Sequence, residues 1–163
     1  MLEIGQIIMY RRNVCKICDI IQNFRGNGDY YKLAPCYDSS LIIHAPVNSP
    51  KLTFRPLLTK AEIDNLVKKI PAIECADTNE RTLENTYKGL FNSENHESLI
   101  CIIKTAYVRG EAKSRKGQKR CEKDKIYFQK AEKALYGELA IVLGKSIDDT
   151  RSYIIEHVAA LSA

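Results

Sequence analysis

The sequence lacks any long apolar run. The longest runs, such as that at residues 139–143, fall far short of the roughly 20 residues that cross a bilayer. Residues 1–5 carry an early acid and are not followed by the basic-then-apolar pattern of a signal peptide. We therefore expect a cytoplasmic protein without a membrane partner.

The common motifs of enzymes are also missing. The sequence contains no G-x-S-x-G, no P-loop and no G-x-G-x-x-G, and its acids are scattered among bases as on solvated helix faces. The segment Arg25-Gly26-Asn27-Gly28 is rich in glycine, but a hairpin turn explains both glycines. We expect no enzymatic activity, no cofactor and no small-molecule substrate.

Only one cysteine motif is present among six cysteines. Cys15 and Cys18 form a C-x-x-C, but a zinc site needs about four ligands, and no second C-x-x-C or histidine pair accompanies it. If residues 14–21 form a strand, these two side chains point to opposite faces. We expect free thiols and no metal. A zinc or thiol protein stays open as an alternative.

The first 58 residues predict β-structure. Apolar, strand-forming stretches separated by tight turns occur at residues 6–10, 14–21, 30–36, 41–45 and 52–58. Pro56 would end the last strand or confine it to an edge. Strands this short, with no room for crossover helices, indicate a small antiparallel barrel of the SH3-like or Tudor-like type.

From Thr59 the apolar period becomes helical. Thr59 and Glu62 have the form of a capping box, and the first helix should stop before Pro71. Further helices are expected at residues 82–92, 97–113, 123–143 and after Ser146. The prediction is an α+β chain of two domains: a barrel at 1–58 and an all-helical bundle at 82–163. A connecting helix and linker at 59–81 would join them.

Positive charge is concentrated between Lys104 and Lys125. This stretch holds nine basic and three acidic residues, a local charge of +6 in a chain of net charge +5. Such a cluster suits phosphate binding, and the predicted loop at 114–118 lets the backbone approach a phosphate. A solvated, charge-rich loop is the alternative. Charge alone carries no base specificity.

Short motifs along nearly the whole chain resemble, in order and spacing, those of one family. They are Ile4-Gly5 with Tyr10; Tyr31 with Ile43-His44-Ala45-Pro46; Arg55 with Leu57-Leu58; Tyr87-Lys88 with Leu90; and Lys125 with Ala131, Leu135 and Gly137-Glu138-Leu139-Ala140. Together they resemble the CarD/CdnL family of bacterial transcription regulators, whose barrel is shared with the polymerase-interacting domain of the transcription-repair coupling factor.

The resemblance implies two binding surfaces. The barrel would pair a strand edge with a lobe of the RNA polymerase β subunit, and the helical domain would contact promoter DNA at the upstream edge of the −10 element. The polymerase-binding positions are Arg25, Ile42, Ile43 and His44, with His44 in place of a family arginine. The DNA-binding positions are Leu83, Lys88 and Lys125, and Lys116, Lys119 and Arg120 of the basic cluster would extend that surface.

Leu83 stands where the family has a tryptophan that wedges into the minor groove, and this chain contains no tryptophan. Leu83 is therefore either a wedge or a core residue. The expected function is that of a monomeric regulator that modulates the stability of the open promoter complex. The alternative of the same class is a polymerase-binding adaptor without productive DNA contact.

Overall fold

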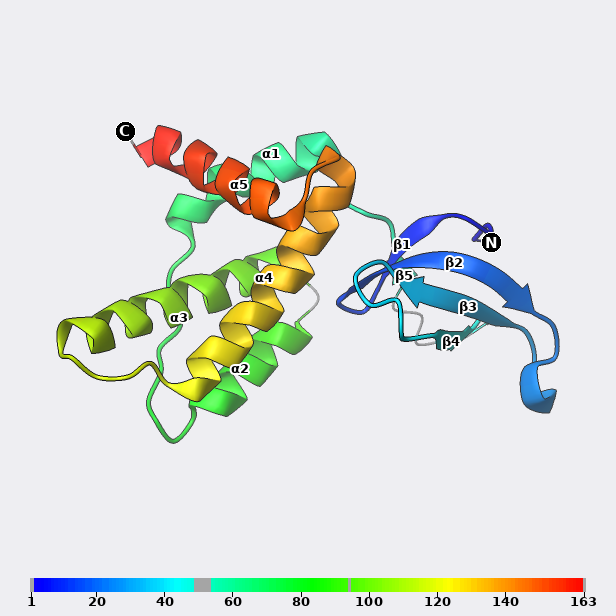
Figure 1. Ribbon diagram of the computed structural model, residues 1–163, viewed down its shortest axis with the longest axis horizontal. Helices are drawn as coiled ribbons and strands as arrows, with labels where there is room; N and C mark the ends of the chain where they lie inside the picture. The colour runs from blue at the N-terminus through cyan, green and yellow to red at the C-terminus, as the bar shows by residue number, and fades with distance from the viewer. Residues whose placement is uncertain (1, 49–53, 94, 163) are drawn as a thin grey trace. The chain divides into compact units, whose positions relative to one another are not determined.

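The computed structural model of the chain describes residues 2–48, 54–93 and 95–162. Within these residues it is an α+β structure in which five strands precede five α-helices (Figure 1). The chain divides into two compact units, Met1–Leu58 and Thr59–Ala163. No helix in the described part of the chain combines the length and the apolar character needed to cross a bilayer.

The strands of the first unit form one antiparallel sheet. They are β1 (Ile7–Tyr10), β2 (Asn13–Ile21), β3 (Tyr30–Pro35), β4 (Ile43–Pro46) and β5 (Phe54–Arg55). Their order in the sheet is β4-β3-β2-β1-β5, so β4 and β5 are its edges. The strands lie close to the predicted positions, but the sheet curls into a half-barrel, and within the described residues its edge strands β4 and β5 are not paired with each other. Leu52 and Thr53, where the last strand was expected to begin, lie outside the described residues.

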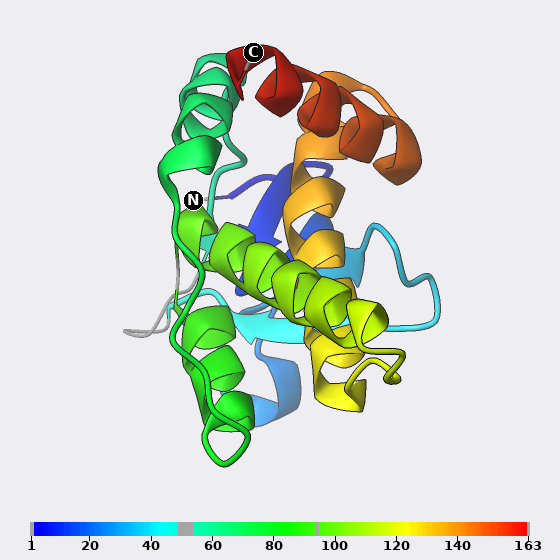
Figure 2. The ribbon, with the colours of Figure 1, turned by 90° about the vertical axis from the view of Figure 1, so that its left-hand side faces the viewer.

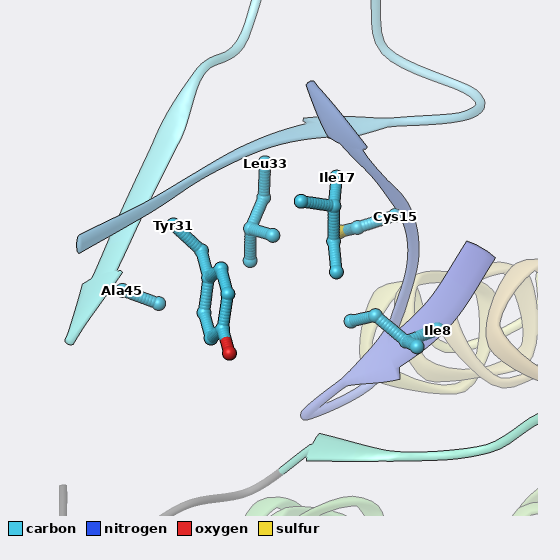
Figure 3. Packing of buried hydrophobic residues seen from close by; sticks show 6 residues of the cluster. All are labelled: Ile8, Cys15, Ile17, Tyr31, Leu33 and Ala45. Atoms are coloured by element: carbon cyan, nitrogen blue, oxygen red, sulfur yellow. The ribbon is translucent and has the colours of Figure 1, made fainter. Parts of the chain in front are cut away.

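The concave face of this sheet holds the core of the first unit. Alternate residues of neighbouring strands point to this face, which Figure 3 shows as Ile8, Cys15, Ile17, Tyr31, Leu33 and Ala45. A register shift between Ile17 and Asp19 marks a β-bulge in β2, which bends the strand and helps the sheet to curl. Cys15 is fully buried and Cys18 is exposed, which confirms that the two thiols face opposite sides of β2.

The helices of the second unit surround one central member. They are α1 (Lys60–Lys69), α2 (Leu83–Asn92), α3 (His96–Arg115), α4 (Glu122–Leu143) and α5 (Ile147–Ser162). α4 contacts each of the other four, and Figure 2 shows α3 crossing it and α5 approaching α1. The predicted capping box of α1 is confirmed, because Thr59 and Glu62 exchange both side-chain-to-backbone hydrogen bonds.

The ends of α4 and α5 also follow the sequence. Gly144 ends α4 in the left-handed region at φ 66°, where a residue without Cβ is favoured. Ser146 then begins the next helix, because its Oγ accepts a hydrogen bond from Asp149 N–H at 3.0 Å.

The connecting region of the sequence prediction does not stand apart. α1 buries Ile63, Leu66 and Val67 and contacts α5 and α4, so it belongs to the helical unit. The segment after α1 is also held in place, since the ammonium group of Lys104 in α3 donates to the carbonyl oxygens of Ile70 and Ile73.

The two thiols of the C-x-x-C should differ in reactivity. Burial, with a smaller effect of nearby Cys36, raises the pKa of Cys15 to about 11, so little of it is thiolate in mildly alkaline buffer. Iodoacetamide should therefore modify Cys18 in the folded protein and reach Cys15 only after denaturation, as read by peptide mass spectrometry. Equal labelling of both thiols in the folded state would contradict the placement of β2.

Candidate functional site

The edge strand β4 and the residue before it carry three of the four residues predicted to bind polymerase, Ile42, Ile43 and His44. β4 pairs with β3 and is the outermost strand of the described sheet on that side. Ile42 precedes the strand and is 45% exposed, beside Leu41 at 46%. Ala45 points into the core, so His44 lies on the opposite, solvent-facing side. An edge of this kind offers free backbone groups next to apolar side chains.

An aromatic stack joins this strand to the turn between β2 and β3. The Phe24 ring lies parallel to His44, with 4.5 Å between ring centroids and 14° between planes. The Arg25 guanidinium carbon lies 5.1 Å from the centroid of the same ring. The structure thereby brings Arg25 and His44 to one place. Sequence reasoning missed Phe24, although a phenylalanine inside a polar, glycine-rich turn is an unusual signal.

The turn that carries Phe24 is closed by its own hydrogen bonds. Phe24 N–H donates to Gly28 O at 2.7 Å, and Asn23 N–H donates to the Asp29 carboxylate at 3.0 Å. Arg25 adopts φ 50°, in the left-handed region that costs a residue with a Cβ about 1 kcal/mol or more. The turn thus holds the arginine in a conformation that an open loop would not favour.

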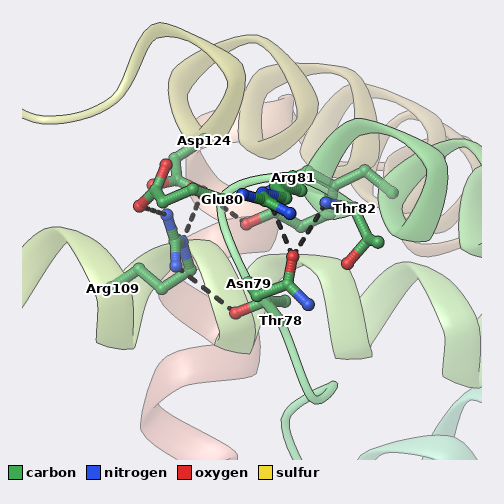
Figure 4. A network of polar contacts seen from close by, with 8 residues as sticks. Thr78, Asn79, Glu80, Arg81, Thr82, Arg109 and Asp124 are labelled. Carbon is green, nitrogen blue, oxygen red and sulfur yellow. Dashed lines mark hydrogen bonds and ion pairs between the residues drawn. The ribbon is translucent and has the colours of Figure 1, made fainter.

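A buried carboxylate organises the helical unit at the other candidate site. Asp124 in α4 is 3% exposed, and its carboxylate accepts hydrogen bonds from Tyr87 Oη at 2.6 Å and from Arg109 Nε at 3.1 and 3.2 Å. Arg109 in α3 also donates to Thr78 Oγ1 at 3.3 Å and Glu80 Oε1 at 3.1 Å (Figure 4). The network joins α2, α3, α4 and the segment before α2.

The network changes the acidity of its members. Burial, followed by the hydrogen bond to Asp124, raises the pKa of the Tyr87 hydroxyl. Burial alone would lower the pKa of Arg109, but its bonds to Glu80 and Asp124 outweigh burial and raise it. The hydrogen bond from Arg109 lowers the pKa of Glu80. All these groups therefore keep the charge states that the network needs at neutral pH.

The basic cluster of the sequence is divided by the fold. Lys104 and Arg109 serve internal contacts and present no free charge to a phosphate. The exposed remainder lies around the connection between α3 and α4, where Gly117 turns the chain at φ 69°. Lys116, Lys119 and Arg120 are all exposed there. The structure thus brings together three of the predicted DNA-binding residues.

Lys125 adjoins this group, whereas Lys88 does not. Lys125, in the first turn of α4, lines a cavity together with Tyr107 of α3. Its near neighbour Lys123 instead lies 3.9 Å from Glu84 of α2, one helical turn before Lys88. Lys88 belongs to α2, whereas Lys125 lines a cavity between α4 and α3.

Leu83 lies in the core at the start of α2. Its side chain is fully buried. Of the two alternatives that the sequence left open, a wedge or a core residue, the structure shows the core residue. Insertion of Leu83 between base pairs would require it to leave this packing.

Comparison of the chain with protein-family models and with curated proteins finds no match. In the described residues no group of three His, Cys, Asp or Glu side chains is arranged to hold a metal ion. The candidate site consequently has two parts: the β4 edge with Phe24, Arg25 and His44, and the basic surface at the α3–α4 connection.

Removing the buried carboxylate should destabilise the helical unit strongly. Asp124→Ala leaves Arg109, 18% exposed, without its innermost partner, and we expect a loss of about 3–5 kcal/mol in the free energy of unfolding. Urea denaturation followed by circular dichroism measures this. The control is Glu80→Gln, whose side chain is 72% exposed and whose removal should have little effect. A loss in Asp124→Ala as small as that in the control would show that the network does not hold the helices together.

Proposed function

We propose that this chain is a non-enzymatic transcription regulator with one protein-binding and one DNA-binding surface. More particularly, we propose a regulator of the CarD/CdnL type that docks on the β subunit of bacterial RNA polymerase and contacts promoter DNA. The observation that carries the proposal is the β4 edge, where exposed Ile42 adjoins a stack that gathers Arg25 and His44.

The β4 edge suits the addition of a strand from a partner. An extended segment laid beside an edge strand gains main-chain hydrogen bonds, while flanking side chains select its sequence. Here Leu41 and Ile42 supply apolar contact, and Arg25 supplies a positive charge that favours an acidic partner segment. We take the curled sheet of residues 1–58 to be a Tudor-like barrel that presents this edge.

The surface at the α3–α4 connection would act on DNA through phosphates. Lys116, Lys119 and Arg120 are exposed together, and each neutralised phosphate releases counterions. Tethered to polymerase, such contacts would shift the balance between closed and open promoter. A shift of about 1.4 kcal/mol changes the ratio tenfold, so a few contacts suffice.

A second candidate function is a polymerase-binding adaptor that makes no productive DNA contact. The burial of Leu83 favours it, because the position expected to wedge into the minor groove is occupied by a core side chain. The internal contacts of Lys104 and Arg109 favour it too, because they reduce the charge available to phosphates.

A negative charge introduced on the β4 edge should weaken docking. We expect the wild type to bind the isolated β-subunit lobe in a pull-down, and His44→Glu to weaken binding by about tenfold or more, since a like charge opposes an acidic partner. The matched control is Lys16→Glu, an exposed position on β2, which is separated from β4 by β3. The absence of any binding by the wild type would remove the basis of the proposal.

The salt dependence of promoter binding separates the regulator from the adaptor. The variant with Lys116 and Lys119 both changed to Ala should bind polymerase–promoter complexes less tightly. Its logarithmic salt slope should fall by up to about 0.9 for each phosphate that the variant no longer neutralises. A control with Lys68 and Lys133, exposed on α1 and α4, changed to Ala should behave as the wild type. Unchanged affinity and slope in the first variant would favour the adaptor.

A further inference from the structure

A cavity opens beside the basic surface, between α3 and α4. Its volume is about 270 Å³. Its lining combines two aromatic rings, two cations and two carboxylates: Tyr107, Phe128, Arg120, Lys125, Asp124 and Glu132. Ligand pockets for drug-sized molecules span about 300–1,000 Å³, so this one suits a smaller group.

The aromatic side chains of the cavity are accessible. Tyr107 is 54% exposed, although large aromatic side chains normally bury most of their surface, and Phe128 is half-buried. An exposed aromatic ring at a basic surface is a platform on which a nucleobase can stack, because every base has a π-face.

The charges of the cavity favour an anion. Its two carboxylates are already engaged, Asp124 by Arg109 at 3.1 Å and Glu132 by Arg151 at 2.8 Å. The two cations, Arg120 and Lys125, have weaker partners.

Glu111 lies 3.8 Å from Arg120, and Glu122 lies 3.8 Å from Lys125. In both pairs the two side chains are each 40% exposed or more, so water and salt screen the attraction. A phosphate can therefore compete for either cation.

We propose that this cavity holds one unpaired nucleotide of single-stranded DNA. The base stacks on Tyr107, and the adjoining phosphate lies between Arg120 and Lys125. This inference rests on the proposed function for its partner, since an opened promoter exposes unpaired bases. It goes beyond that function because it assigns a site specific for single strands. The basic loop by itself would contact only phosphates and would therefore bind any duplex.

The absence of tryptophan from the chain gives a direct test. Tyr107→Trp places the only indole of the protein in the cavity, and a base stacked on it should quench its fluorescence. Val108→Trp is the matched control, because Val108 is the next residue of α3, is equally exposed at 54%, and does not line the cavity. A short single-stranded oligodeoxynucleotide of mixed sequence should quench the indole at 107 and leave that at 108 nearly unchanged. Equal quenching at both positions would overturn the proposal.

Affinity measurements complete the test. Tyr107→Ala should weaken binding of the same oligonucleotide about tenfold, whereas Tyr107→Phe should keep it, because stacking needs the ring and not the hydroxyl. Alanine suits an exposed helix position, so folding should be unaffected. Tighter binding of the matching duplex, or equally tight binding of free deoxyadenosine monophosphate, would refute a single-strand site. Docking on the β-subunit lobe is measured separately. If the protein binds the lobe but the oligonucleotide tests fail, only the single-strand site is rejected and the proposed function stands.

Discussion

The helical unit depends on one requirement: the buried carboxylate of Asp124 must keep its partners. A charge so far from water is tolerated only where opposite charge and hydrogen bonds surround it, and Tyr87 and Arg109 supply both. These partners come from α2 and α3, so satisfying one carboxylate fixes three helices against one another. Arg109 extends the same constraint to the segment before α2 through Thr78 and Glu80. The position of the α3–α4 connection, and with it the basic surface, follows from this network.

The arrangement of the sheet unit depends instead on the alternation of side chains between the two faces of each strand. With Ala45 in the core, the strand period turns His44 outward, and the pairing of β4 with β3 leaves one edge of β4 at the margin of the sheet. The turn between β2 and β3 then brings Phe24 against His44, far from it in sequence. The two surfaces thus have different origins, one in a buried ion pair and one in strand register. They lie on separate compact units of the chain.

The sequence predicts features that involve neighbouring residues, such as helix caps and turns. It does not predict which residues are buried by contacts with distant parts of the chain. The capping box at Thr59 and the turn at Gly144 involve neighbours in the chain, so the sequence predicts them directly. The assignment of α1 to the helical bundle could not be read locally, because it depends on which helices cover its apolar face. The sorting of the basic cluster into internal and exposed members depends on distant partners, which are the carbonyls of Ile70 and Ile73 for Lys104 and the buried Asp124 for Arg109. The roles of the predicted polymerase- and DNA-binding residues stay predictions.

Gly110 shows how closely the basic surface is tied to helix stability. It lies within α3, where glycine is about 1 kcal/mol less favourable than alanine. A Cβ at this position would lie 3.1 Å from Nε of Arg120, so the missing methyl group is what lets the arginine pass close over the helix. Alanine at position 110 would stabilise the helix but would displace the guanidinium group of Arg120. A substitution at Gly110 would therefore alter the geometry of this basic surface from within α3, without changing any of its charged residues.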